Sequence, residues 1–153
     1  MSNQNWETPW EVFNALHAEF NFTLDGAADP TNTKLPNFLS DWAGYINANE
    51  YIAGSSDVIF CNPPYANMDS WIATFIDWSM TGAIVVALHL PSISPVWFAH
   101  LWATASEYRL VYPRIQFLGT QSSNTRDSVI TVWRPYCMKK EAREPKVTRW
   151  SWL

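Results

Sequence analysis

The spacing of apolar residues predicts a helix near the start of the chain, over residues 8–20. In this stretch, TPWEVFNALHAEF, apolar side chains recur on one helical face at Val12, Phe13, Leu16 and Phe20. Thr8 and Glu11 have the spacing of a capping box, and Pro9 stands at the first helical position. We therefore expect the hydroxyl group of Thr8 to cap this helix.

The same periodicity predicts two further helices. Residues 94–105, SPVWFAHLWATA, form a short helix with Pro95 at its start. Residues 67–80, NMDSWIATFIDWSM, form a longer one with Asn67 or Asp69 as the cap. Its predicted buried face carries Trp71, Ile72, Phe75 and Ile76.

Continuous apolar runs between the helices predict buried strands. The clearest are residues 57–61, DVIFC, and residues 83–90, AIVVALHL, which Pro91 ends. A brief strand, FTLD, ends at Asp25. A polar loop, GTQSSNTRD, precedes the last of three strand-like runs, which are residues 107–113, 114–118 and 128–135.

This order of elements predicts an α/β fold, with a mostly parallel sheet, an antiparallel carboxyl-terminal strand and helices on both faces. A chain of 153 residues is long enough for one compact domain, which we place at residues 1–138. Residues 139–153, KKEAREPKVTRWSWL, are predicted to form a basic, Trp-ended tail that is loosely ordered.

Charge is distributed unevenly along the chain. The net charge is −4, but Lys34 is the single Lys or Arg in residues 1–108, and the other nine lie in residues 109–153. Such asymmetry is typical of a basic end that faces a polyanion such as a nucleic acid. A solvated tail with ordinary surface charges gives the same pattern.

Cysteine usage and the amino terminus indicate a cellular setting. Cys61 and Cys137 have no metal-ligand spacing around them, so we expect a reduced, cytoplasmic protein without a metal site. The first ten residues, MSNQNWETPW, do not have the pattern of a signal peptide, and no apolar run approaches membrane-spanning length.

The candidate chemistry follows the first buried strand, in Asn62, Pro63, Pro64 and Tyr65. The two prolines hold this loop rigid and extended at the carboxyl end of a strand, where ligands bind in open α/β sheets. The side-chain carbonyl of Asn62 and a proline carbonyl can accept both N–H groups of an exocyclic amine, and Tyr65 can stack on its ring. Such a site positions an amine for attack on an electrophile that a cofactor must supply. A proline pair is also ordinary loop punctuation.

The sequence NPPY after a hydrophobic strand resembles the signature of amino-group methyltransferases that use S-adenosylmethionine. Nearly the whole chain is similar to the phage and prophage DNA N-6-adenine methyltransferases, through WETP, FNFTLDGAADPTNTK, DWAG, VIFCNPPYANMDSWI and RIQFLG in that order. The resemblance implies a Rossmann-like methyltransferase fold, S-adenosylmethionine as cofactor and adenine N6 in DNA as acceptor, in a bacterial host. It also implies that Asn62 and the Pro63 carbonyl hold the amine of a flipped adenine, on which Tyr65 stacks.

Four further residues match the cofactor site of the family. Thr8 and Pro9 match a TP pair beside the methionine part of the cofactor, and Asp25 matches the first cofactor-binding acid. Asp41 is the candidate for binding the ribose hydroxyls. A helix cap also explains Thr8, and a strand-end turn also explains Asp25. The turn DGAADP has a single glycine, fewer than most methyltransferases have there, which puts the strength of cofactor binding in question.

The basic carboxyl-terminal third supplies candidate DNA contacts. Arg114, Arg126 and Arg134 flank the final strands and are expected to bind phosphates. Gln121 and Asn124, with Arg126, are residue types that can bind base edges, although a polar hairpin loop has the same composition. A homodimer is a further expectation, since it would add recognition surface.

Two other functions fit the same residues. Methyltransferases that act on RNA bases or on protein glutamine side chains also use NPPY, while the clustered basic residues favour a nucleic acid. A catalytically inactive DNA-binding or interaction module is the other alternative, because a fold alone does not establish an activity.

Overall fold

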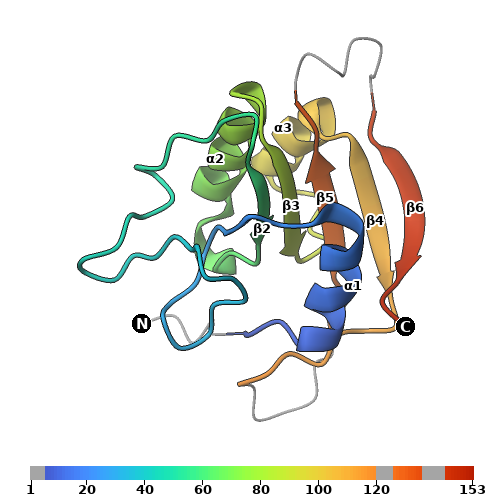
Figure 1. Ribbon diagram of the computed structural model, residues 1–153. Helices are drawn as coiled ribbons and strands as arrows, with labels where there is room; N and C mark the ends of the chain where they lie inside the picture. The colour runs from blue at the N-terminus through green and yellow to red at the C-terminus, as the bar shows by residue number, and fades with distance from the viewer. Residues whose placement is uncertain (1–5, 120–125, 136–143) are drawn as a thin grey trace.

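The computed structural model describes residues 6–119, 126–135 and 144–153 (Figure 1). The helices in these residues are α1 (Trp10–Phe20), the short 3₁₀ helix η1 (Tyr65–Asn67), α2 (Met68–Met80) and α3 (Val96–Thr104). The strands are β1 (Leu24–Asp25), β2 (Val58–Cys61), β3 (Ile84–His89), β4 (Glu107–Tyr112), β5 (Val129–Trp133) and β6 (Lys146–Ser151).

The strands form one sheet in the order β1-β2-β3-β5-β4-β6. Neighbouring strands are parallel except for β5, which is antiparallel to both β3 and β4. The carboxyl ends of the five parallel strands therefore meet at one edge, the lower edge in Figure 1. This confirms the predicted α/β fold of Rossmann-like type with a mostly parallel sheet. The antiparallel strand is the penultimate one, since β6 is parallel to β4.

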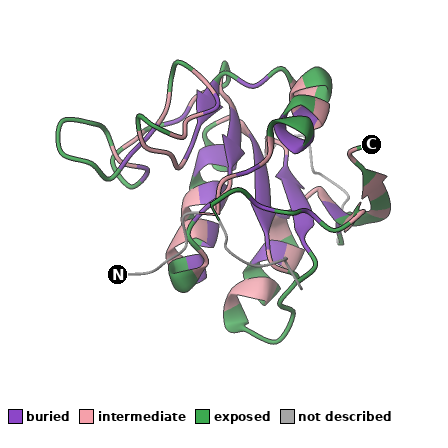
Figure 2. Cartoon of the chain, turned by 90° about the horizontal axis from the view of Figure 1, so that it is seen from below, coloured by how far each residue is buried: buried purple, intermediate pink, exposed green. Residues whose placement is uncertain are grey.

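Helices cover both faces of the sheet, as predicted. On one face α1 packs Val12, Phe13 and Leu16 into a cluster with Phe60 and Val86. On the other face, α2 and α3 share a cluster with the opposite sides of the same strands, through Ile72, Phe75, Leu101, Ile59 and Val85. Because β2 and β3 are buried on both faces, their sequences are continuous apolar runs (Figure 2).

The start of α1 differs from the prediction. The helix begins at Trp10, Pro9 occupies the N-cap position, and no side chain bonds to the cap. The predicted capping box is therefore wrong, because the hydroxyl of Thr8 has a different partner, described below. At α2 the predicted Asn67 does occupy the N-cap position, again without a side-chain cap bond.

Residues 114–118 do not form the strand that their alternation predicts. Leu118 forms an isolated antiparallel bridge with Glu7, through two backbone hydrogen bonds of 3.1 and 2.9 Å. The alternation has another cause, since Ile115 and Phe117 are both buried in the cluster that contains α1. The alternation of apolar residues in 114–118 thus reflects one buried side of an irregular segment and not a strand.

Residues 146–151 form a strand, where the sequence predicts a loosely ordered tail. They pair with β4 along its length, from Glu107 opposite Lys146 to Tyr112 opposite Ser151. The indole of Trp152 donates to the Pro113 carbonyl oxygen at 2.8 Å. β6 lies at the edge of the sheet and pairs with one strand, so much of it faces solvent. Its sequence is therefore polar, like that of an unstructured tail.

Within the described residues, no helix combines the length and the apolar character needed to cross a membrane.

Candidate active site

A cavity of about 780 Å³ opens at the carboxyl edge of β1 and β2. Its walls come from the segment before α1, the turn after β1, the loop of residues 39–49 and the loop that joins β2 to α2. The lining includes these residues from the sequence analysis: Thr8, Asp25, Asp41, Asn62 and Pro64. The topology thus brings together residues that are spread over more than a third of the chain.

The segment before α1 holds the amide of Asn62. Its Nδ2 atom donates to the Trp6 carbonyl oxygen at 2.7 Å and to Thr8 Oγ1 at 3.1 Å. A backbone carbonyl can only accept, so the nitrogen end of the amide must face Trp6. Thr8 is 3% exposed, which keeps water from competing for its hydroxyl. The orientation of the Asn62 oxygen is therefore determined by its neighbours.

Tyr65 contacts the other end of this amide. Its hydroxyl donates to Asn62 Oδ1 at 3.0 Å, and the oxygen retains a second lone pair. Burial raises the pKa of Tyr65, so the hydroxyl stays a neutral donor. The ring lies edge-on to Trp6, with centroids 5.8 Å apart. Tyr65 also lines a second cavity of about 130 Å³, together with Trp97 and Met68.

The two prolines of this loop differ, since Pro64 belongs to the lining of the main cavity and Pro63 does not. Pro63 is buried and Pro64 is exposed. Pro63, Pro9 and Tyr65 are near the cavity in sequence but do not belong to its lining. Their predicted contacts with a substrate or cofactor stay predictions.

Cys61 precedes Asn62 and would be the nearest nucleophile for a covalent route. It is fully buried, and burial, with the nearby charge of Asp25, raises the pKa of its thiol well above the ordinary value. The thiolate is the reactive form of cysteine, so this residue is held inert.

Asp25 ends β1 at the floor of the cavity. Its carboxylate accepts from the backbone N–H groups of Lys34 at 3.1 Å and Ala27 at 3.4 Å. Burial raises its pKa from 3.8 to about 6, and these hydrogen bonds and the charge of Lys34 oppose the rise only in part. A ligand that donates hydrogen bonds or carries positive charge would favour its ionised form.

Asp41 reaches the same cavity along a different path. Phe38 pairs with Asp25 in a parallel bridge, and the Leu39 N–H donates to the Asp25 carbonyl oxygen at 2.8 Å. The chain leaves this bridge at the same edge as β1. Asp41, two residues after Leu39, therefore lies in the cavity wall.

The glycine-poor turn has a packing reason. A Cβ atom at Gly26 would lie 3.1 Å from Ile59 Cγ2 and 3.3 Å from Cys61 Cβ. The single glycine therefore stands where the turn after β1 packs closely against side chains of β2. Ala27 and Ala28 line the cavity, and their small side chains leave its volume open.

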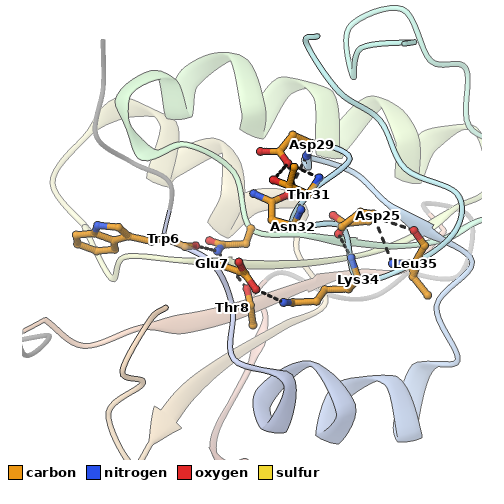
Figure 3. A network of polar contacts seen from close by, with 11 residues as sticks. Trp6, Glu7, Thr8, Asp25, Asp29, Thr31, Asn32, Lys34 and Leu35 are labelled. Atoms are coloured by element: carbon orange, nitrogen blue, oxygen red, sulfur yellow. Dashed lines mark hydrogen bonds and ion pairs between the residues drawn. The ribbon is translucent and has the colours of Figure 1, made fainter. Parts of the chain in front are cut away.

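Glu7 and Lys34 form an ion pair in the cavity wall that the sequence analysis missed (Figure 3). Lys34 Nζ lies 2.9 Å from Glu7 Oε2 and 4.4 Å from the ring centroid of Trp10. The isolation of Lys34 among acidic residues was a visible signal, but a separation of 27 residues gave no sign of its partner. In the described part of the chain, no cluster of three His, Cys, Asp or Glu side chains is placed to bind a metal ion.

The structure separates the three candidate phosphate-binding arginines. Arg114 follows β4 and Arg126 precedes β5, so both lie toward the edge where the cavity opens. Arg114 makes an exposed ion pair with Asp127 at 3.3 Å. Arg134 follows the antiparallel β5, lies at the opposite edge and pairs with Glu107 at 2.7 Å. Gln121 and Asn124 lie outside the described residues.

Known proteins share this sequence pattern. A family model described as DNA N-6-adenine-methyltransferase (Dam) matches residues 1–148. The chain therefore belongs to this family of adenine-specific DNA methyltransferases, as the resemblance of its motifs implied. One relative is the DNA N-6-adenine-methyltransferase of Haemophilus phage HP1, which is 30% identical over 129 residues, or 80% of this chain and 70% of the relative.

A solved structure described as a predicted O-methyltransferase from Agrobacterium tumefaciens is a more distant match. The two share 14% identity with a TM-score of 0.42 over 75% of this chain. The chain spans about half of that protein, 52%, and a likeness at this level does not bear on function.

Proposed function

We propose that the protein transfers a methyl group from S-adenosylmethionine to the N6 amine of adenine in DNA, with the base turned out of the duplex. The observation that carries the proposal is the held amide of Asn62, whose oxygen keeps an open lone pair beside a large cavity. An acceptor fixed in this way can orient an amine without forming a covalent bond to it.

The cavity suits this cofactor in size and charge. A volume of about 780 Å³ lies within the range of small-molecule sites. Its lining carries the carboxylates of Glu7, Asp25, Asp29 and Asp41. When bound, S-adenosylmethionine supplies an electrophilic methyl group on a positively charged sulfur, which an acidic lining complements. Asp41 would accept hydrogen bonds from the ribose hydroxyls, and Asp25 would favour the positive charge.

Asn62 would orient the acceptor amine. One N–H would donate to Asn62 Oδ1 and the other to the Pro63 carbonyl oxygen, which favours a pyramidal nitrogen with its lone pair free. The hydrogen bonds that the amide donates to Trp6 and Thr8 stop it from turning its NH₂ group toward the acceptor amine. Because the amide is already oriented, the transfer step needs little reorganisation.

The aromatic residues around this amide support a flipped base as substrate. Tyr65 and Trp97 line the smaller cavity and could stack on a purine ring. An adenine amine is otherwise enclosed in base pairing and stacking, so the nucleotide must leave the helix, at a cost that stacking in the pocket offsets. Arg114 and Arg126 would hold the phosphates beside it.

The test is transfer of a labelled methyl group from S-adenosylmethionine to unmethylated DNA, with RNA and protein acceptors assayed in parallel. Digestion of the DNA to nucleosides should place the label in N6-methyladenine. The variant Asn62→Ala tests the role of the loop in catalysis. It should lose at least about a hundredfold in rate, as expected when a preorganised polar group is removed, while its fold and cofactor affinity persist.

Each other outcome has a definite meaning. Label in RNA or protein would keep the chemistry and replace the acceptor. An absence of transfer together with an absence of cofactor binding would favour an inactive DNA-binding module. Full activity in Asn62→Ala would overturn the assignment of the catalytic loop.

A further inference from the structure

A partly buried ion pair in the cavity wall joins two segments that are distant in sequence. Lys34 Nζ contacts Glu7 Oε2 at 2.9 Å, and the two side chains are 3% and 31% exposed respectively (Figure 3). Burial of the Lys34 charge carries a desolvation cost that its attraction to Glu7 offsets only with good geometry. The pair is thus weak support for a purely stabilising role.

The pair has hydrogen-bonding capacity left over. The ammonium group of Lys34 has three donors, of which one points to Glu7. Among the contacts of the described residues, Lys34 reaches only the Oε2 oxygen of Glu7, so Oε1 can accept from another group. Both residues belong to the lining of the cavity.

The pair is also the one place in the described lining where both signs of charge meet. The other charged lining residues are acidic, namely Asp25, Asp29 and Asp41. A ligand carboxylate would be repelled by these three aspartates, and Lys34 is the one positive charge among the described lining residues. A ligand with a carboxylate and an ammonium group side by side would match Lys34 and Glu7 charge for charge.

We propose that Lys34 and Glu7 bind the amino-acid end of S-adenosylmethionine, with Lys34 donating to the carboxylate and Glu7 accepting from the ammonium group. The inference rests on the proposed function, since it takes the cavity to be the cofactor site. The remaining carboxylates are then left for the sulfonium and the ribose. The competing explanation is a structural tie between the segment before α1 and the turn after β1.

Cofactor analogues distinguish a ligand contact from a structural tie. Isothermal titration calorimetry would compare S-adenosylmethionine and S-adenosylhomocysteine with 5′-methylthioadenosine, which lacks the amino-acid end. Lys34→Met should weaken binding of the first two by about tenfold or more, the usual loss for a charged hydrogen bond. The same variant should leave 5′-methylthioadenosine within about twofold. Lys146→Met, an exposed charge on β6, is the matched control and should change none of the three.

Glu7→Gln separates the two halves of the contact. Decarboxylated S-adenosylmethionine keeps the ammonium group and lacks the carboxylate. Its binding should weaken about tenfold in Glu7→Gln and stay unchanged in Lys34→Met. Equal losses for all ligands in either variant would mean a structural tie and would overturn the proposal, as would an absence of any loss.

The wild-type protein provides a test that does not depend on how the variants fold. It should bind S-adenosylmethionine at least about tenfold more tightly than the decarboxylated form. Equal affinities in a protein that methylates DNA would overturn this inference alone. A wild-type protein that binds none of these ligands would overturn the proposed cofactor as well.

Discussion

Thr8 illustrates how one side chain can satisfy a sequence rule and still serve a different purpose. Its spacing to Glu11 fits a capping box, yet its hydroxyl accepts from the Asn62 amide at 3.1 Å, and α1 begins without a side-chain cap. We therefore regard Thr8 as a positioning residue, acting on the substrate through Asn62.

Thr8→Val should lower the rate of methyl transfer by about fivefold, because a hydrogen bond of about 1 kcal/mol to the Asn62 amide is lost. Cofactor affinity should stay within about twofold, and Thr8→Ser should restore most of the rate. Single-turnover transfer and calorimetry measure the two quantities separately. A fall in cofactor affinity with an unchanged transfer rate would mean instead that Thr8 contacts the cofactor, as the family resemblance implies.

Asp25 should make cofactor binding depend on pH. Its pKa is about 6 in the folded protein because burial disfavours the charged form, against an ordinary value of 3.8. A positively charged ligand favours the ionised carboxyl, so affinity should fall as the pH drops below about 6, with protons released on binding. Calorimetry from pH 5 to 8 in buffers of different ionisation enthalpy measures both effects. Asp25→Asn should bind more weakly, with no such pH dependence.

The same shift has a consequence for stability. A folded-state pKa above the unfolded value means that the contribution of Asp25 is fully present below pH 3.8 and is lost as the pH rises through about 6. The loss is on the order of 2–3 kcal/mol at neutral pH. Asp25 is thus a group whose ionisation opposes folding, which is expected of a residue kept for binding.

At the scale of elements, β6 is the part of the fold that the sequence concealed. The Lys146 N–H donates to the Ser106 carbonyl oxygen at 2.9 Å. In a parallel pair, alternate residues direct their backbone groups to the same neighbour, so Thr148 also faces β4 and Val147 faces outward. Half of the backbone groups of this edge strand are therefore unpaired within the sheet.

Thr148→Pro should lower the free energy of unfolding by about 1–3 kcal/mol, because it removes a backbone donor that faces β4. Val147→Pro is the matched control on the outward side and should cost less. Urea denaturation of both variants measures the difference. Equal costs would mean that the register of β6 against β4 is not as described.

At the scale of the whole molecule, the basic carboxyl-terminal third is not one surface. Arg109 is 6% exposed and donates to both carboxylate oxygens of Glu19 at 2.7 Å, so it braces α1 against β4. Arg134 lies at the far edge beside Glu107, whose pKa is lowered by hydrogen bonds from Arg134 and Arg109 despite its partial burial. Arg114 and Arg126 lie toward the edge of the cavity.

DNA binding should therefore distinguish these arginines by its salt dependence. The double variant Arg114→Ala, Arg126→Ala should reduce the slope of log affinity against log salt by about 2, at roughly 0.9 per phosphate contact. Arg134→Ala should leave the slope unchanged, because Arg134 lies at the edge of the sheet opposite the cavity. Fluorescence anisotropy over a salt series measures both. A reduced slope for Arg134→Ala would mean that DNA also follows the opposite edge. Sedimentation in the same buffers would test the expected homodimer.

The sequence by itself determined the central layers and the place of the Asn62-Pro63-Pro64 loop at the end of β2. The apolar runs of β2 and β3 require burial on both faces, and the period of α2 requires a helix over them. These are local patterns, so one sequence suffices to detect them. The stiffness of Asn62-Pro63-Pro64 is local too, and a parallel strand before it assigns the loop to the binding edge.

Only the tertiary structure decided how these parts meet. The partner of Thr8, the Glu7–Lys34 pair and the place of Asp41 depend on contacts between segments that are far apart along the chain. The edge on which Arg134 lies depends on the reversed direction of β5. Periodicity describes how a segment presents its side chains, but it holds no information on which distant segment will face them. That choice is made when the whole core packs.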